Sequence, residues 1–399
     1  FAAIKISESV YWVGAIDWGV RNFHGYTTSH GTTYNAYLIL ADKPTLIDTV
    51  KKGFEAEMFA RIASVIEPEK IEYIVSNHSE PDHTGSLADA ITLINPEKVF
   101  ASKAGVQTLK RHYALGMELT PVETGQTLSL GNRTLTFTET KMIHWPDSMF
   151  SYLKEEKLLF SQDAFGMHLA SSERFDDELD HALLEQQAAD YYANIITPYS
   201  QPVQKVLSDV QSSGLPIEIM APDHGPVWRT KKGIEKIISL YDRWSRRTLQ
   251  NKIVIVFDTM WKSTEKMARA VEEGALAHGA QVVVQSLTSN DRSAVASEML
   301  NAAALIVGTP TLNNNIFPSL ADTLTYVKGL KFKTPVGAVF GSYGWSGEAT
   351  RQAADYLSSM GCEVVGEVKA QYVPDENVLK QCVELGRSVA AKVKRIIVV

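Results

Sequence analysis

His78-Ser79-Glu80-Pro81-Asp82-His83 is the most informative stretch of the chain, because it holds four potential metal ligands within six residues. The residues before it, 71–77, read as a β-strand, so the stretch begins where that strand ends. Loops that leave a rigid sheet are where functional side chains gather. The sequence therefore predicts a metal site at the carboxyl end of this strand.

Three more potential ligands lie at the same kind of position. His144, Asp163 and His224 each come just after a predicted strand. Those strands are 134–140, 157–161 and 218–221. A single histidine or aspartate in a loop is more often solvated or a cap, but seven such residues after four strands favour one shared metal site.

The other histidines have no such context. We expect them to be solvated or to cap elements, although His24 is a candidate to contact a metal ligand. They are His24, His30, His112, His168, His181 and His278.

The length of 399 residues exceeds one ordinary core and predicts two or three domains. Residues 1–249 read as many short strands with some helices, which predicts an α/β or α+β layered domain. In residues 250–399 strands alternate strictly with helices, and nearly continuous apolar strands predict a doubly wound parallel sheet. The strands expected there are 253–257, 281–285, 304–308, 336–340 and 363–365, and the helices are 263–278, 293–301, 318–330, 347–360 and 376–393.

Composition and charge exclude several classes of protein. The net charge of −7 disfavours nucleic-acid and anionic-membrane partners. No apolar run approaches the roughly 18–20 residues that cross a bilayer, and the first residues do not read as a secretory signal. Cys362 and Cys382 offer neither a disulfide framework nor a Cys-x-x-Cys pair. We therefore expect a cytoplasmic protein that binds neither nucleic acid nor membrane, and any iron–sulfur or rubredoxin-type centre belongs to a partner.

The spacing His-x-Glu-x-Asp-His at 78–83, with the three later ligands, resembles the metallo-β-lactamase superfamily, whose fold is an αββα sandwich around a two-metal site. Hydrolase members carry histidine at the second ligand position, where this chain has Glu80. With the stretch His-Trp-Pro-Asp-Ser at 144–148 and the flavodoxin-like second half, essentially the whole chain resembles the flavodiiron proteins.

This resemblance implies a di-iron centre with an oxo or hydroxo bridge. Carried over residue by residue, it gives one iron the ligands His78, Glu80 and His144. The other iron takes Asp82, His83 and His224, and Asp163 bridges the two. The chemistry of the donors also supports iron. A carboxylate in place of an imidazole adds a negative charge and a hard oxygen donor, which favours iron or manganese over zinc.

A phosphate cradle is expected where the strand 253–257 leads into a helix, because hydroxyls and backbone N–H groups at a helix N-terminus bind phosphate. Read alone, such a turn is as often only a helix cap. The turn resembles the flavodoxin phosphate loop, with Lys262 where glycine is usual. Its residues expected at the cofactor are Thr259, Met260, Trp261, Lys262, Ser263 and Thr264.

Two later loops strengthen the prediction of a flavin site, because they follow the third and fourth strands at the edge where such sheets bind ligands. Glycines let the backbone approach a flat ring, Trp345 or Tyr343 can flank its face, and backbone groups near Asn313 and Asn314 can bond its edge. A cradle for one phosphate, without a Gly-x-Gly-x-x-Gly fingerprint, favours FMN over FAD or NAD(P). The loop residues expected at the flavin are Pro310, Thr311, Leu312, Asn313, Asn314, Ser342, Tyr343, Gly344, Trp345, Ser346 and Gly347.

The resemblance implies an oxidoreductase in which FMN passes electrons to the iron pair, which reduces O2 to water, NO to N2O, or both. It also implies rubredoxin or a similar small electron donor (in methanogens a deazaflavin), and a head-to-tail homodimer or a dimer of dimers. No side chain beyond the metal ligands needs to act as a nucleophile. Candidates beside the ligands are Trp145, Asp147, Tyr192 and His24, of which the first three are candidate proton donors.

Two other functions compete with this one. A binuclear metal hydrolase fused to a flavodoxin-like domain is disfavoured by Glu80, which stands where hydrolases carry histidine. A flavodoxin-like electron carrier with a structural metal is disfavoured by seven ligands for two ions, because structural zinc sites usually close around one ion.

Overall fold

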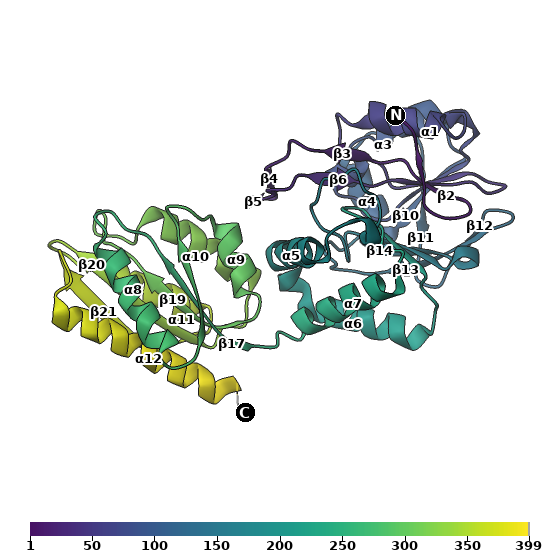
Figure 1. The fold of residues 1–399 in the computed structure, drawn as a ribbon. Coiled ribbons are helices and arrows are strands. Elements are labelled where there is room, and N and C mark those ends of the chain that lie inside the picture. The colour runs from purple at the N-terminus through teal and green to yellow at the C-terminus, as the bar shows by residue number, and fades with distance from the viewer. Residues whose placement is uncertain (398–399) are drawn as a thin grey trace. The chain divides into compact units, whose positions relative to one another are not determined.

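The computed structural model describes residues 1–397 and divides into two compact units (Figure 1). The first unit comprises Phe1–Tyr191 and Tyr199–Ser245, and the second comprises Tyr192–Pro198 and the described residues from Arg246 onward. The division expected after residue 249 lies close to this one, which differs in giving 192–198 to the second unit.

The first unit contains a seven-stranded sheet, a five-stranded sheet and two short two-stranded ladders. The orders are β1-β2-β7-β8-β9-β10-β11 and β12-β13-β14-β15-β16, with β3-β6 and β4-β5 as the ladders. The strands are β1 (Ile4–Lys5), β2 (Val10–Trp12), β3 (Ala15–Asp17), β4 (Asn22–Phe23), β5 (Tyr26–Thr27), β6 (Thr32–Tyr34), β7 (Tyr37–Ile39), β8 (Thr45–Ile47), β9 (Tyr73–Ser76), β10 (Lys98–Ser102), β11 (Leu119–Val122), β12 (Thr127–Ser129), β13 (Thr134–Glu139), β14 (Met149–Leu153), β15 (Leu158–Gln162) and β16 (Ile219–Pro222).

Alternating side chains explain why the two large sheets pack face to face. Along β9, Tyr73 and Val75 join a core that includes Phe137 and Phe160 of the five-stranded sheet. Ile74, between them, points to the other face and packs in a second core with three helices. This confirms the predicted αββα sandwich.

Helices cover both outer faces of the sandwich in the first unit. Helices α1, α3 and α4 cover the seven-stranded sheet, and α6, which packs on α7, lies against the five-stranded sheet (Figure 1). The helices are α1 (Glu55–Ala63), α2 (Pro81–Thr84), α3 (Leu87–Ile94), α4 (Lys103–His112), α5 (His181–Tyr191), α6 (Ser200–Ser213) and α7 (Lys231–Ser245).

The second unit is a five-stranded parallel sheet in the order β18-β17-β19-β20-β21, which confirms the predicted doubly wound fold. The order reverses beside β17, and ligands bind at the carboxyl ends of the strands near such a reversal. The elements are β17 (Gln250–Phe257), α8 (Ser263–Leu276), β18 (Gln281–Ser286), α9 (Arg292–Met299), β19 (Ala302–Gly308), α10 (Pro318–Leu330), β20 (Val336–Tyr343), α11 (Ala349–Ser359), β21 (Glu363–Gln371) and α12 (Glu376–Ile397).

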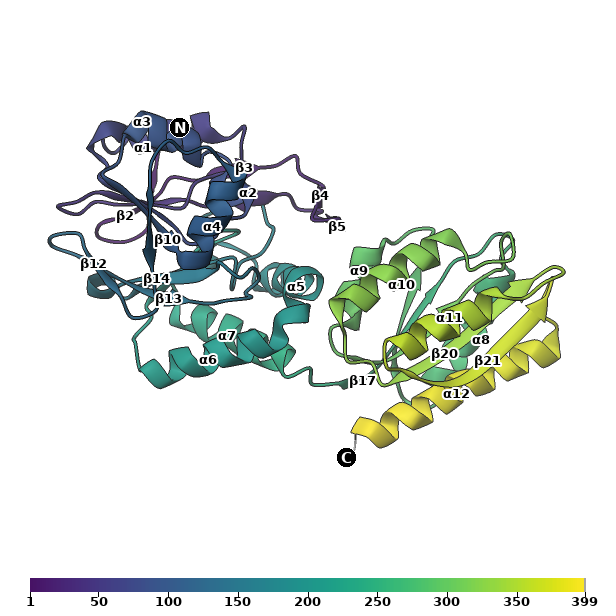
Figure 2. The same ribbon diagram turned by 180° about the vertical axis from the view of Figure 1, so that it is seen from behind.

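Two helical layers bury this sheet, as the opposite views in Figures 1 and 2 show. Helices α8 and α12 pack on the face that carries Ile253 and Ile255. Helices α9, α10 and α11 pack on the face that carries Val254 and Val256. Because both faces are covered, the central strands are continuous apolar runs without polar alternation.

Helices α8 and α12 cross so closely that their contact requires glycine. A Cβ atom placed on Gly274 would lie 1.9 Å from Val383 O, and one placed on Gly386 would lie 2.0 Å from Val271 O. We expect Gly386→Val to lower the free energy of unfolding by about 3 kcal/mol, since neither backbone can yield without separating the helices. Urea unfolding measures this, with Gly329→Val, which meets nothing within 4 Å, as the control. Equal midpoints for the two variants would contradict the prediction.

Both cysteines are buried in the second unit. Burial raises the pKa of Cys362 to about 11 and that of Cys382 to about 12, from an ordinary value of 9.0. Because the folded pKa values exceed the unfolded one, the stability that the neutral thiols contribute is full below pH 9 and falls as pH rises through 9 to 12. We expect neither thiol to react with Ellman's reagent at pH 8 until the protein is unfolded in urea, and rapid reaction of the native protein would refute this.

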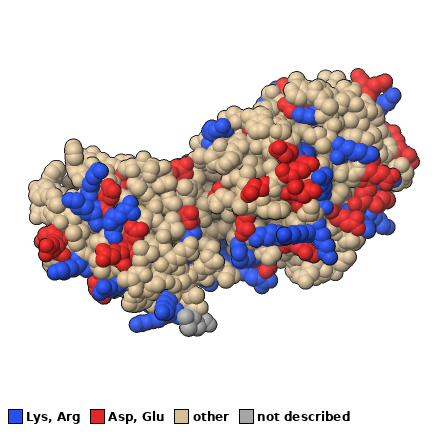
Figure 3. All heavy atoms as spheres, in the orientation of Figure 1, with Lys and Arg blue, Asp and Glu red and all other residues tan. Residues whose placement is uncertain are grey.

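Charged side chains of both signs are interspersed on the face seen in Figure 3, in keeping with the modest net charge of −7. Among the helices of residues 1–397, none is both long enough and apolar enough to cross a membrane.

Candidate metal centre and flavin site

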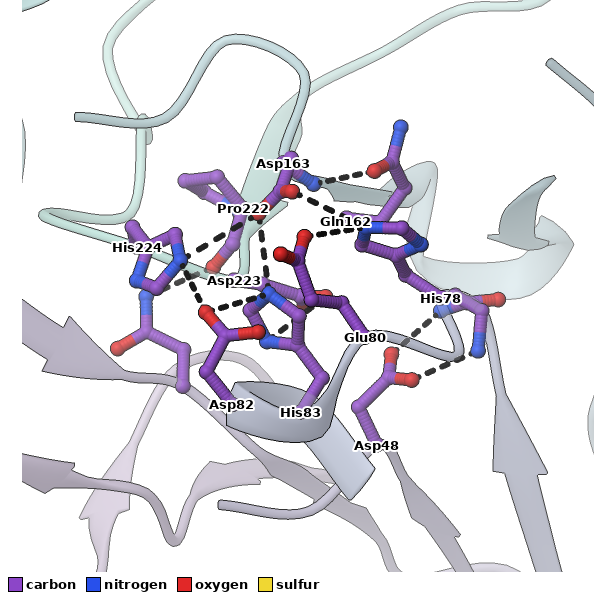
Figure 4. Close-up of polar contacts among 12 residues, drawn as sticks. Asp48, His78, Glu80, Asp82, His83, Gln162, Asp163, Pro222, Asp223 and His224 are labelled. Carbon is purple, nitrogen blue, oxygen red and sulfur yellow. Dashed lines mark hydrogen bonds and ion pairs between the residues drawn. The ribbon is translucent and has the colours of Figure 1, made fainter. Parts of the chain in front are cut away.

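The predicted metal ligands converge on one buried place in the first unit, and Figure 4 labels all of them except His144. They come from four connections: the one that runs from β9 through α2, the one between β13 and β14, and those that follow β15 and β16. Each side chain is buried, and none is more than 7% exposed. The side chains are His78, Glu80, Asp82, His83, His144, Asp163 and His224.

Four of these residues form one group whose ligand atoms lie within 4.8 Å of one another. Glu80 Oε2 lies 3.1 Å from both His78 Nε2 and His144 Nε2. Asp163 Oδ2 lies 3.3 Å from His78 Nε2 and 3.0 Å from His144 Nε2. Ligand atoms about 2.1 Å from a common ion are about 3.0–3.4 Å apart, so this group fits one metal ion.

The remaining residues form a second group. Asp82 Oδ2 lies 3.2 Å from His83 Nε2 and 3.1 Å from His224 Nε2. Asp163 also reaches this group, because its other oxygen, Oδ1, lies 3.1 Å from His83 Nε2 and 3.5 Å from His224 Nε2. The Asp163 carboxylate therefore turns one oxygen toward each group, as a bridging ligand between two ions would.

Several atoms of the second group have no hydrogen-bond partner within the described chain. These buried atoms are both carboxylate oxygens of Asp82, Nε2 of His83 and Oδ1 of Asp163. Leaving such groups unsatisfied costs free energy, and they converge on one point, so a bound cation accounts for them. The donor set of four imidazoles and three carboxylates suits iron.

Two of the four histidines have a partner for the ring nitrogen that faces away from the metal position. His78 Nδ1 lies 3.1 Å from Asp147 Oδ2, which also accepts a 2.6 Å hydrogen bond from the Ser79 N–H. His224 Nδ1 lies 2.5 Å from the Thr33 carbonyl oxygen. Such partners fix which nitrogen faces the metal position. His83 Nδ1 faces Asp223 Oδ2 at 3.6 Å, beyond hydrogen-bond distance.

The pKa values show that the cluster stabilises positive charge. Burial lowers the pKa of His83, but Asp82, Asp163 and Asp223 outweigh it and raise the pKa to about 10. Burial likewise opposes the hydrogen bonds of His78 to Asp147, Asp163 and Glu80, which still raise its pKa well above the ordinary value.

A pocket of about 700 Å³ opens onto the cluster from the protein surface, and Glu80 and Asp82 lie in its wall. His24, on the turn between β4 and β5, also lines this pocket, and its Nε2 lies 2.8 Å from Glu80 Oε1. One residue of each ligand group, Glu80 and Asp82, therefore borders a pocket that is open to the surface.

The residues predicted beside the ligands have different positions. His24 contacts Glu80, and Asp147 contacts His78, as described above. Trp145 stands edge-on to His78 with 5.4 Å between ring centroids. Tyr192 belongs to the segment 192–198 of the second unit, and its role stays a prediction.

The expectation that His168 is a solvated or capping residue is wrong. It is buried, and its ring centroid lies 4.5 Å from that of His224. Burial, followed by the charge of His224, holds its pKa well below the ordinary value. Its hydrogen-bond partner Thr32 is 136 residues away in sequence, so no local pattern signals the contact.

The flavin residues predicted in three loops surround one pocket of about 370 Å³ in the second unit. Thr259, Lys262, Thr264 and Gly347 are outside its lining. Tyr372, which follows β21, is a lining residue that the sequence analysis missed. The lining residues are Met260, Trp261, Ser263, Pro310, Thr311, Leu312, Asn313, Asn314, Ser342, Tyr343, Gly344, Trp345, Ser346 and Tyr372.

The residues around this pocket suit a flat aromatic ring with one phosphate. Ser263 starts helix α8, whose N-terminus attracts anions, and Lys262 before it has a φ of 66°, which explains why glycine is usual there. Trp261 and Trp345 on the pocket wall are 90% and 86% exposed. Large exposed apolar side chains around a pocket indicate a ligand or a partner that covers them.

Comparisons with known proteins give a match in each of the two units. A family model described as "ODP family beta lactamase" matches residues 32–225, and one described as "Flavodoxin" matches residues 255–386. The chain is 44% identical to a nitric oxide reductase of Moorella thermoacetica and 42% identical to a rubredoxin-oxygen oxidoreductase of Megalodesulfovibrio gigas, over 98% of each chain in both cases.

Solved structures give the same result. The rubredoxin oxygen:oxidoreductase from Desulfovibrio gigas superposes with a TM-score of 0.96 and 42% identity, over 98% of this chain and 99% of that one. The flavodiiron protein from Giardia intestinalis superposes with a TM-score of 0.95 and 34% identity, over 99% and 97%. With this identity along its whole length, and with the two sites in place, the chain belongs to the flavodiiron protein family.

Proposed function

We propose that the protein is an oxidoreductase that reduces O2 to water, NO to N2O, or both, at a two-iron centre supplied with electrons by FMN. The observation that carries this proposal is the Asp163 carboxylate, which turns one oxygen toward each of two ligand groups. Relatives 44% and 42% identical to the chain are named nitric oxide reductase and rubredoxin-oxygen oxidoreductase.

The proposal assigns the two ligand groups to two irons and the lined pocket of the second unit to FMN. The chemistry that bound iron and FMN would supply is the binding of the gas and the transfer of electrons to it. We propose 1–249 as the di-iron domain and 250–399 as the FMN domain. The iron ligands would be His78, Glu80, His144, Asp82, His83, His224 and the bridging Asp163.

The protein's own residues orient the ligands and give access to them. Asp147 accepts from His78 Nδ1 and so directs Nε2 of this ring toward Glu80 and Asp163. The pocket beside Glu80 and Asp82 admits a diatomic gas. Glu80 in place of an imidazole supports redox chemistry over hydrolysis, because an anionic oxygen donor stabilises the higher charge of oxidised iron.

Rubredoxin or a similar small carrier is the proposed electron donor, as the name of one relative suggests. The reduced coenzyme F420 is the alternative, since a relative 40% identical is named coenzyme F420H2 oxidase. We further propose a cytoplasmic head-to-tail homodimer, or a dimer of such dimers, in which the FMN of one subunit serves the irons of the other. The physical reason for proposing this dimer is that electron transfer is fast only when flavin and iron lie a short distance apart.

Anaerobic turnover of the purified protein with each gas, and with reduced rubredoxin as the donor, tests this function. We expect two irons and one FMN per chain, and consumption of O2 or NO that stops when iron is removed. The ratio of the two rates ranks the substrates. A protein that holds zinc and hydrolyses an ester or a lactam, or an iron-loaded protein that consumes neither gas, would disprove the proposal.

A further inference from the structure

His168 is a buried histidine that is not among the predicted metal ligands, yet it is joined to one of them. Its Nδ1 lies 2.7 Å from Thr32 Oγ1, and the same hydroxyl oxygen lies 3.2 Å from Nδ1 of His224. Thr32 begins strand β6 and is fully buried. One hydroxyl group therefore connects a ligand histidine with a histidine outside the ligand set.

The direction of these hydrogen bonds follows from the ring nitrogen that faces the metal position. His224 turns Nε2 toward Asp82 Oδ2, at 3.1 Å, so Nδ1 carries the hydrogen. That N–H donates to the Thr33 carbonyl oxygen at 2.5 Å and points toward Thr32 Oγ1. The Thr32 hydroxyl keeps its own hydrogen to donate. Its nearest acceptor is His168 Nδ1 at 2.7 Å, compared with 3.2 Å for the Thr33 oxygen.

Aromatic rings hold His168 in this position. The ring centroids of Phe23, Tyr191 and Tyr26 lie 4.8, 5.1 and 5.6 Å from that of His168. Its Nε2 is buried without a hydrogen-bond partner in residues 1–397. Packing alone does not account for an imidazole here, because an apolar side chain would fill the space without the cost of a buried polar nitrogen. The hydrogen bond to Thr32 is what an imidazole adds.

We propose that Thr32 and His168 are positioning residues for His224: His168 orients the Thr32 hydroxyl, which acts beside the Thr33 carbonyl oxygen to hold the His224 ring so that Nε2 faces the metal ion shared with Asp82 and His83. The outer partner of a metal-bound histidine fixes its tautomer and rotation, and loss of such a partner costs roughly 10–100-fold in metal affinity. The inference rests on the proposed function only in that the site holds metal.

Two pairs of variants in the full-length protein, loaded with iron and FMN, test this role. Thr32→Val and His168→Leu remove the hydroxyl and its acceptor, whereas Thr32→Ser and His168→Gln keep a donor and an acceptor. We expect a chelator to extract one iron about tenfold faster from the first pair, with a changed Mössbauer doublet for that iron alone. The second pair should match the unaltered protein. Thr108→Val, which removes a hydroxyl bonded to the Ala104 carbonyl on α4, is the control.

Three outcomes distinguish the explanations. Unchanged extraction and unchanged doublets in Thr32→Val and His168→Leu would overturn the proposal. Equal loss of the iron from Thr32→Ser and His168→Gln would also overturn it, because the packing of these side chains and not the hydroxyl would then support His224 beside the Thr33 carbonyl oxygen. An unaltered protein that keeps two irons but reduces neither gas would disprove the proposed function. The extraction experiment would still test the positioning role of Thr32 and His168 in that case.

Discussion

Replacing Asp163 with asparagine is expected to remove iron from both positions and to abolish gas reduction, while FMN stays bound. Asp163 is the one ligand that faces both groups, with Oδ2 3.0 Å from His144 Nε2 and Oδ1 3.1 Å from His83 Nε2. Asparagine keeps the size but replaces one oxygen by an NH2 group, which cannot bind a cation and turns its hydrogens toward it. The variant also lacks one negative charge between two cations.

The loss should exceed the roughly 10–100-fold that removal of an outer partner costs. Metal analysis and FMN absorbance on the same sample, followed by anaerobic turnover, measure the effect. Asp209→Asn is the matched control, because this exposed aspartate on α6 pairs only with Lys205 among the described residues. Two irons and undiminished turnover in Asp163→Asn would show that the bridge is not the organising ligand of the site.

Much of the fold could be predicted because the pattern of apolar residues within each segment indicates its secondary structure. The central strands of the second unit, such as β17 and β19, are buried on both faces and therefore read as apolar runs. The edge strand β21 was expected only as 363–365 but extends to Gln371. Its outer residues alternate between buried and exposed, with Lys369 exposed and Ala370 buried, so the apolar run ends before the strand does.

The metal site was predictable for a related reason. Four of its side chains are neighbours in 78–83, and the other three follow strands that could be recognised. The supporting residues had no such signal. Thr32 and Thr33 are ordinary strand residues, and Thr33 lies 191 residues from the His224 ring that it holds. Only the folded chain brings them together.

The second large effect is expected at the flavin pocket, where Ser263→Asp should weaken FMN binding at least ~100-fold. Ser263 is the first residue of α8 and lines the pocket. A phosphate in this cradle carries close to two negative charges at pH 7. A carboxylate about 4 Å away repels each charge by about 4 kcal/mol at an effective dielectric constant of 20, which more than outweighs the attraction of the helix N-terminus.

This substitution should leave the fold intact, because aspartate is favourable in the first turn of a helix. Fluorescence titration of the flavin-free protein with FMN measures the affinity, and metal analysis should still find two irons. Ala294→Asp adds the same charge to the first turn of α9, outside the pocket lining, and should bind FMN normally. If Ser263→Asp retained FMN as tightly as that control, the phosphate would lie elsewhere than at the start of α8.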